Sequence, residues 1–278
     1  MPAAFSQHPA AFGILAVLAA GLIVAEAVAT IRLARRGFDL RDTLLSLGVA
    51  LGHVLVRPLD VAVFAAVFPV AAAAAPWQLP IERPATWIAG FLVTEFSYYW
   101  MHRASHRVRW LWASHSVHHS STTFTLASAL RLAWTGVLSG EWLFFVPAVL
   151  LGFPPTMVAA LLAANLVYQF VLHTELSPRW GPLERVLNTP SHHRVHHAAD
   201  GVYLDRNYGG VLIVFDRLFG TFAAERPDVP PTYGIAGVAP DRDPVSIAFG
   251  EWRRMAADLG RAGSWRAAAA ILFGPPGG

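Results

Sequence analysis

Hydrophobic and polar positions alternate along this chain in long blocks rather than in short periods. Five apolar blocks stand out, at residues 10–31, 44–75, 85–100, 132–151 and 155–172. A helix needs about 20 apolar residues to cross the hydrocarbon core of a bilayer, and most of these blocks approach or exceed that length. The pattern predicts an all-α membrane bundle of four or five transmembrane helices. Segments 101–131 and 173–278 would form a helical cap, so that residues 1–278 make one membrane-embedded domain.

Some features of the blocks affect the helix count. Block 44–75 is interrupted by "RPLD" at Arg57–Asp60, which is compatible with one kinked helix or with two shorter ones. "GFPP" at Gly152–Pro155 predicts a tight turn before the last block, because glycine often ends a helix and proline cannot continue one. Near the C-terminus, "WRRMAADLGRAGSWRAAAAILF" predicts an amphipathic stretch that lies on the membrane surface.

The orientation of the bundle can be predicted from the arginines after the first block. Arg32, Arg35 and Arg36 follow it directly, and basic residues tend to mark a cytoplasmic helix end. Counting crossings from there returns the ends at His102 and His173 to the same side. We therefore expect a multi-pass protein of a bacterial inner membrane with a cytoplasmic cap. "MPAAFSQHPA" lacks the basic region of a cleavable signal peptide, so the first block is expected to remain as a span.

Composition supports the membrane assignment and narrows the chemistry. Of the 278 residues, 55% are hydrophobic and only 14% charged, whereas about 25% are charged in a typical soluble domain. All 21 basic residues are arginine, and in so apolar a chain we expect them to contact loops and lipid headgroups rather than nucleic acid. The absence of cysteine excludes disulfides, thiolate metal sites and a cysteine nucleophile, so any metal must be bound by nitrogen or oxygen.

Histidines are concentrated in spaced groups. Ten of the twelve fall between positions 102 and 197, in "HRASH", "HSVHH", "HHRVHH" and one isolated position. Residues three and four apart share one face of a helix, so each group directs its imidazoles to one point. A single histidine is usually structural, but this repetition indicates metal binding. The nine candidate ligands are His102, His106, His115, His118, His119, His173, His193, His196 and His197.

The number and type of these ligands restrict the metal. A zinc ion takes about four ligands, so eight or nine imidazoles are enough for two ions. Nitrogen ligands suit zinc, copper, iron or nickel. A site at a bilayer meets alkyl chains and sterols, and attack on an unactivated C–H bond requires the oxygen chemistry of iron or copper. The Glu-x-x-His pairs of ferritin-like di-iron proteins are absent, so the pattern favours a histidine-rich membrane di-iron centre.

Three further polar residues are candidate catalytic residues. Glu95 lies on one helical stripe with His102 and His106, where it could hold the tautomer of a ligand or form a structural hydrogen bond to another helix. Asp205 and Asn207 in "DRNYGG" could bond ligand imidazoles, although turn formation explains the same residues.

Other side chains have weaker signals. Gln169, one turn before His173, could support that ligand as Glu95 would. Arg131 and Arg194 are candidate contacts for lipid phosphates, and Asp216 and Arg217 a candidate ion pair. Three phenylalanines are candidate walls of an acyl tunnel: Phe144, Phe145 and Phe170.

The histidine groups and the sequence motifs around them resemble those of a known family. "HRASH", "WASHSVHHSS", "GPLERVLNTPSHHRVHH" and "YLDRNYGGVLIVFDRLFGTF" are similar to the fatty acid hydroxylase and sterol desaturase superfamily, and most of all to its alkylglycerol monooxygenase branch. The resemblance is strong over roughly residues 80–225. It implies a di-iron centre that activates O₂ and hydroxylates or desaturates an alkyl or acyl lipid or a sterol. The nine histidines would be the ligands, with His192 outside the set.

The resemblance also implies an external electron donor. The alkylglycerol branch uses tetrahydrobiopterin, and other branches use cytochrome b5 or ferredoxin-type proteins. Animal members carry an acidic residue directly after the first histidine box, where this chain has Arg107. That departure weakens the case for the pterin and for an ether lipid. The chain has no glycine-rich dinucleotide fingerprint, which also favours a separate donor.

Two other classes of protein use membrane histidines. A metal transporter or sensor would need polar residues along the spans, and blocks three to five offer little beyond Glu95, Ser97 and Asn165. A haem cytochrome would leave most of the histidines without a role. The oxygenase therefore remains the leading hypothesis, with a histidine-rich metal-binding or transport protein as the alternative.

Overall fold

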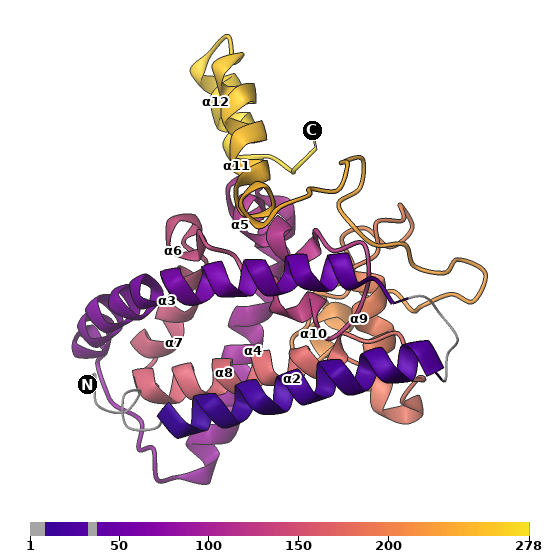
Figure 1. The fold of residues 1–278 in the computed structure, drawn as a ribbon. Coiled ribbons are helices and arrows are strands. Elements are labelled where there is room, and N and C mark those ends of the chain that lie inside the picture. Colours follow the sequence, from indigo (N-terminus) through magenta and orange to yellow (C-terminus); the bar gives the residue numbers. More distant parts are fainter. Residues whose placement is uncertain (1–8, 33–37, 278) are drawn as a thin grey trace.

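The computed structural model describes residues 9–32 and 38–277, apart from the side chains of residues 9–12, and within this part of the chain it is helical without β-strands (Figure 1). This confirms the all-α prediction. The start of the N-terminal decapeptide and the arginines Arg35 and Arg36 lie outside the described residues. The longer helices are α2 (Pro9–Arg32), α3 (Leu40–Ala74), α4 (Pro84–Arg107), α5 (Arg109–His119), α8 (Pro155–Leu172) and α11 (Pro244–Gly260).

Three helices are long and apolar enough to cross a bilayer: Gly13–Arg32 within α2, Leu40–Ala74 and Pro155–Leu172. They correspond to the first, second and last of the predicted blocks. Their apolar side chains point outward, as Leu55 does with 73% of its surface exposed and Val70 with 69%. Apolar surface on this scale is unfavourable in water and fits contact with lipid chains.

Block 44–75 forms one continuous helix, which decides between the two possibilities left by the sequence. Pro58 and Pro69 lie inside α3, and α3 bends along its length (Figure 1). A proline within a helix cannot donate a hydrogen bond to the carbonyl four residues earlier, and its ring displaces that turn. The bend therefore follows from the prolines that the sequence places there.

Block 132–151 differs from the prediction. It is divided into α6 (Gly136–Ser139), η2 (Glu141–Phe145) and α7 (Val146–Leu150). Gly140 separates the first two, with a φ of 82° that ends a right-handed helix. At 1.5 Å per residue each piece is far too short to cross a bilayer, so a single helical span here was wrong.

The ends of several helices meet near the histidine-rich segments. Asp42, in the first turn of α3, bonds Arg131 and Ser121 in the loop after α5 at 2.7 and 2.6 Å. Glu26 on α2 accepts the backbone N–H of Leu126 in the same loop at 2.7 Å. In Figure 1 the end of α8 lies toward the same side as α9 (Pro190–His196) and α10 (Val214–Leu218). These contacts tie the apolar helices to the polar segments that follow α4.

The C-terminal stretch predicted to be amphipathic forms two helices. α11 packs on α5 through Arg109, which pairs with Glu251 at 2.8 Å and Asp258 at 2.7 Å. α12 (Trp265–Phe273) follows and contains no buried residue, with Trp265 76% exposed. Its position on a membrane surface stays a prediction.

Gly52 is required where α3 approaches Trp134. A Cβ at Gly52 would lie 1.9 Å from Cζ2 of Trp134, whose indole N–H donates to the Val49 carbonyl at 2.8 Å. We expect G52A to destabilise the fold by about 1–3 kcal/mol, because the ring must move. Thermal unfolding in detergent checks this. The matched control is G21A in α2, which has nothing within 4 Å of its added Cβ and should lose no stability. An equal melting temperature for both variants would contradict the close approach.

Candidate metal centre

Four elements deliver the nine candidate ligands. α4 carries the first box near its C-terminal end, and α5 begins after the single residue Val108 and carries the second. His173 caps the C-terminal end of α8, and α9 carries the third box. α9 begins with Pro190. Proline is favourable at the first position of a helix, because the N–H group that it lacks would have no acceptor within the helix. The sequence places each box at a helix end, and the fold brings these ends together.

The structure separates the nine histidines into two groups. In each group the ligand nitrogens lie within 4.8 Å of one another. The first group, called here the five-histidine group, contains His102, His106, His115, His119 and His196. The second, the four-histidine group, contains His118, His173, His193 and His197. All nine predicted residues are thus brought together, and the second and third boxes each contribute to both groups.

The imidazoles are arranged as they would be around a cation. The Nε2 atoms of His102 and His115 lie 3.0 Å apart, and those of His118 and His173 lie 3.2 Å apart. Two nitrogens bound at right angles to one ion at about 2.1 Å also lie about 3 Å apart. The Nε2 atoms of His106 and His196 are buried without any partner, a costly state that a bound cation would relieve. The donor set fits a metal.

Backbone carbonyls determine which nitrogen can bind a metal. The Nδ1 atoms of His102, His173 and His196 contact the carbonyls of Tyr208, Gln169 and Arg206 at 2.8, 2.8 and 2.9 Å. A carbonyl only accepts, so each Nδ1 carries the proton. The Nε2 lone pair is then directed at its group, which is the usual arrangement of a metal-ligating histidine.

Burial keeps the imidazoles neutral. It lowers the pKa of His118 to about 4 and that of His196 to about 3. Burial first and neighbouring histidines second hold the pKa of His102, His106 and His119 well below the usual range. Neutral imidazole is the form that binds a metal. Among the described residues, neither group includes a carboxylate.

The three candidate catalytic residues lie beside the groups rather than in them. Glu95 accepts hydrogen bonds from Asn165 on α8 and from the backbone N–H groups of Val211 and Leu212. Of the two interpretations offered by the sequence, its contacts match the structural hydrogen bond to another helix. It bonds no histidine directly.

Asp205 and Asn207 have different surroundings. Asp205 pairs with Arg107 at 2.6 Å, and its other oxygen is 4.0 Å from Nδ1 of His106. Asn207 is buried and bonds the backbone of His192 and Ala223. It therefore joins α9 to the segment that follows α10, which is closer to the turn interpretation than to a direct bond with a ligand imidazole.

His192 lies outside both groups, as expected. Its Nε2 is 4.0 Å from Glu184, and its ring meets Phe222 edge-on at 5.3 Å. On α9 it points away from the neighbouring ligands His193 and His196.

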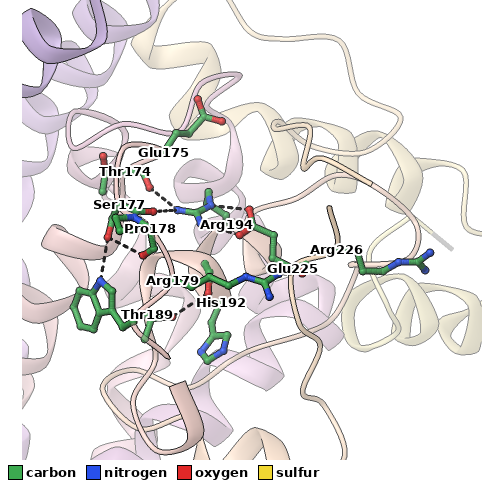
Figure 2. Close-up of polar contacts among 12 residues, drawn as sticks. Thr174, Glu175, Ser177, Pro178, Arg179, Thr189, His192, Arg194, Glu225 and Arg226 are labelled. Carbon is green, nitrogen blue, oxygen red and sulfur yellow. Dashed lines mark hydrogen bonds and ion pairs between the residues drawn. The ribbon is translucent and has the colours of Figure 1, made fainter. Parts of the chain in front are cut away.

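Two arginines predicted to meet lipid phosphates are instead buried ion-pair partners. Figure 2 shows Arg194 between Glu225 and the carbonyls of Thr174 and Ser177. Both Glu225 oxygens accept from it at 2.8 Å. Arg131 is only 1% exposed and pairs with Asp42. The expectation of headgroup contacts was wrong, because both side chains neutralise a carboxylate inside the protein.

Asp216 and Arg217 do not pair with each other as proposed. Asp216 is fully buried and accepts from the backbone N–H groups of Tyr208 and Gly209 at 2.7 Å. Arg217 lies over the ring of Phe222 at 3.7 Å. Asp216 and Arg217 are adjacent on α10 and point in different directions, so each has its own partner.

A cavity of about 280 Å³ opens onto the five-histidine group. His106, His119 and His196 line it together with apolar side chains that include Trp112 and Ile235. No member of the four-histidine group lines it. Small molecules can therefore approach one group more directly than the other.

A second, almost wholly apolar groove of about 420 Å³ lies between α4 and the η2–α7 segment. Phe144 lines it, Phe145 packs in the core and Phe170 lines neither cavity, so an acyl tunnel walled by all three phenylalanines is not formed among the described residues. None of the nine histidines lines this groove.

The comparisons with known proteins can now be set beside this geometry. Residues 87–221 match the model of the family described as fatty acid hydroxylase. This range contains all nine histidines and the helices that hold them. This part of the chain, just under half of its length, is similar to fatty acid hydroxylases.

Several curated relatives also resemble part of the chain. The alkylglycerol monooxygenase of Homo sapiens is 44% identical over 173 residues, which are 62% of this chain and 38% of that protein. That of Danio rerio is 48% identical over 158 residues, 57% of this chain and 34% of the relative. The ornithine lipid hydroxylase of Rhizobium tropici is 31% identical over 135 residues, 49% and 41% of the two chains. The matched part thus spans less than half of each relative.

These relatives leave the compartment undecided. Most of those that match are from animals or plants, so they lend no support to the bacterial inner membrane predicted from the sequence. No solved structure shows a significant match to the chain. The cytoplasmic position of the histidines stays a prediction.

Proposed function

We propose that this chain is an O₂-dependent membrane lipid hydroxylase in which nine histidines hold two iron ions, one in each group. The observation that carries the proposal is the pair of adjacent, buried, all-histidine groups at the ends of apolar helices. A structural zinc site would need only about four ligands, and a second complete group argues for a two-metal centre. Iron in such a centre would supply the O₂ activation needed to attack an unreactive C–H bond.

The residues of the chain prepare this chemistry in three ways. Buried neutral imidazoles provide nitrogen lone pairs, and the carbonyls of Tyr208, Gln169 and Arg206 hold three of them in the required tautomer. Burial of the histidines excludes water, which limits side reactions of oxidising species. The cavity beside the five-histidine group gives small molecules access from one side. In this proposal Glu95, Asp205 and Asn207 are not catalytic residues; they position the segments that surround the histidines.

The proposed substrate is a membrane lipid with a long alkyl or acyl chain. The apolar surfaces of α2, α3 and α8 support this, because helices of this length and composition fit a bilayer, where such lipids reside. Alkylglycerols and ornithine lipids are the first compounds to test, because relatives named for them match part of the chain. A sterol is a further candidate, and desaturation a further outcome at the same centre.

Each turnover requires electrons from a separate donor. We propose a ferredoxin or cytochrome b5-type protein or a reduced pterin in this role. We further propose that segments 101–131 and 173–278 form a cytoplasmic cap, where such donors are available. Arg107 pairs with Asp205, a residue that lines the cavity beside the five-histidine group.

The proposal is tested by oxygen labelling. Cells that express the chain or its H118A variant are grown under ¹⁸O₂, and their lipids are compared by mass spectrometry. We expect a hydroxylated lipid that carries one ¹⁸O atom and depends on His118. A chain that binds metal but yields neither a labelled lipid nor an O₂-dependent double bond with any candidate class would contradict the enzyme and favour a metal-binding or transport protein.

A further inference from the structure

One short segment of backbone holds two ligands of the five-histidine group. We call residues 205–212, "DRNYGGVL", the acceptor loop. Its Tyr208 carbonyl accepts from Nδ1 of His102 at 2.8 Å, and its Arg206 carbonyl accepts from Nδ1 of His196 at 2.9 Å. These ligands come from different helices, α4 and α9. The loop therefore aligns two helices at one metal group.

The backbone of the acceptor loop is strained on both sides of Arg206, whose carbonyl accepts from His196. Asp205 and Asn207 have φ values of 61° and 57°, and they are the positive-φ residues other than glycine within the described chain. They flank Arg206, whose carbonyl faces His196. Asparagine and aspartate tolerate this left-handed conformation better than other side chains, but it persists only when the surroundings enforce it. Asn207 is held by three hydrogen bonds to backbone atoms of His192 and Ala223.

Two buried carboxylates hold the other end of the loop. Asp216 accepts the N–H groups of Tyr208 and Gly209, both at 2.7 Å. Glu95 accepts those of Val211 and Leu212 at 2.8 and 2.9 Å. Asp216 is 0% exposed and Glu95 is 1% exposed. Of the five backbone N–H groups of residues 208–212, four thus donate to these two carboxylates. Neither carboxylate forms a hydrogen bond with a histidine of the described chain.

The two glycines of the loop match this arrangement. A Cβ at Gly209 would lie 2.2 Å from the Leu212 carbonyl oxygen. A Cβ at Gly210 would lie 2.1 Å from Nδ2 of Asn165, the side chain that donates to Glu95. Only glycine allows the loop to approach the carboxylates this closely.

Among the described residues, no hydrogen bond joins the four-histidine group to the acceptor loop. Its His173 bonds the Gln169 carbonyl within its own helical turn, and the backbone of Arg131 interacts with His118. We propose that Glu95 and Asp216 are positioning residues that set the metal affinity of the five-histidine group through the acceptor loop and leave the four-histidine group unchanged. The inference rests on the metal centre of the proposed function. It extends that centre to residues that do not touch the ligands.

The variants that test this inference follow from the hydrogen bonds. In D216N an amide NH₂ must face a backbone N–H, because Tyr208 and Gly209 are both fixed donors. E95A removes both acceptors. Loss of support behind a metal ligand typically weakens metal binding by about 10–100-fold. We therefore expect each variant to bind one metal ion per chain at concentrations where the wild type binds two, measured by metal analysis of the purified full chain.

E95Q serves as the conservative variant. Asn165 donates to Glu95 and accepts from Gln169, and Gln169 accepts from the Tyr98 hydroxyl. If both amides rotate, the new amide donates to Asn165, Asn165 donates to Gln169, and Gln169 donates to the hydroxyl. Every bond is then kept, and the glutamine oxygen still accepts from the loop. E95Q should retain both ions.

Double variants show which group loses its ion. D216N should cause no further loss in H106A, whose five-histidine group is already broken, and should remove the remaining ion from H193A. The control is E26Q on α2, which alters another buried carboxylate that accepts a backbone N–H, here from Leu126. It should retain both ions.

Three results would overturn the inference. D216N and E95A could bind two ions with wild-type affinity. They could lose both ions equally. They could fail to fold while E95Q folds. That result would show that the two carboxylates stabilise the whole helical bundle and do not act specifically on the five-histidine group. Because metal content is measured without substrate, a wild-type chain that binds two ions but oxidises no lipid would contradict the proposed function alone.

Discussion

A chain with His193 replaced by alanine is expected to lose one of its two metal ions and nearly all lipid hydroxylation. His193 is fully buried, and its Nε2 lies 3.2 Å from that of His173 in the four-histidine group. Its removal leaves three imidazoles and a space in their place. Loss of residues that merely support a ligand costs about 10–100-fold, so loss of the ligand itself should reduce activity by more than about 100-fold. Metal analysis and the ¹⁸O₂ lipid assay measure the two effects.

The matched control for this change lies next to it. His192 is also buried and belongs to α9, but it is outside both groups. H192A should therefore retain both ions and hydroxylation. If H192A and H193A lost metal to the same extent, the effect would belong to the helix and not to ligation, and the ligand assignment would fail.

The second large effect concerns stability. R131M should lower the free energy of unfolding by about 3–5 kcal/mol, because it leaves the carboxylate of Asp42 buried without its cation. Arg131 also donates to Ser46 and Ser120 at 2.9 Å, so the change loosens the start of α3 from the loop after α5. Thermal unfolding in detergent, followed by circular dichroism, gives the shift in melting temperature.

Two further variants make the stability result specific. Adding D42N to R131M should recover part of the loss, because the uncompensated charge is then removed. Arg226 and Asp228 form an exposed ion pair, and R226A should leave the melting temperature nearly unchanged. A small effect of R131M, or an equal effect of R226A, would show that the buried pair is not a major support of this junction.

The clustering of the nine candidate ligands could be predicted from the sequence, but their division into two groups could not. The i, i+3, i+4 spacing places His115, His118 and His119 on one helix face. The spacing does not reveal that His118 belongs to a different group from its neighbours. That division depends on how α4, α5, α8 and α9 cross, which is determined by packing between distant segments.

Of the five apolar blocks, three correspond to helices long and apolar enough to cross a bilayer in the described part of the chain. Block 85–100 lies within α4, which is not among them, and block 132–151 is divided into short pieces. The average hydropathy of residues 132–151 does not reveal a single residue at which the helix ends. Gly140 and Pro147 lie inside the block and were signals of such a break. In α3 the proline signal was recognised, but its outcome was left open. A proline can bend a long helix or end it, and tertiary packing decides which.

The roles of the charged residues were the least predictable part. Arg131 meets a carboxylate 89 positions earlier in the chain, and Arg194 meets one 31 positions later. Glu95 bonds a loop 116 positions away. A sequence shows that such a charge needs a partner but does not identify it. The sequence drew attention to the side chains of the "DRNYGG" segment, whereas His102 and His196 contact its backbone carbonyls, which no side-chain pattern reveals.

We propose that each of the two histidine groups binds one iron ion. Metal analysis of the full chain, purified without oxygen from cells supplied with iron, is the most direct test. We expect two irons per chain in the wild type and one in either H106A or H193A. A wild-type chain that contains a single zinc ion, or that keeps both ions when His106 or His193 is replaced, would contradict it.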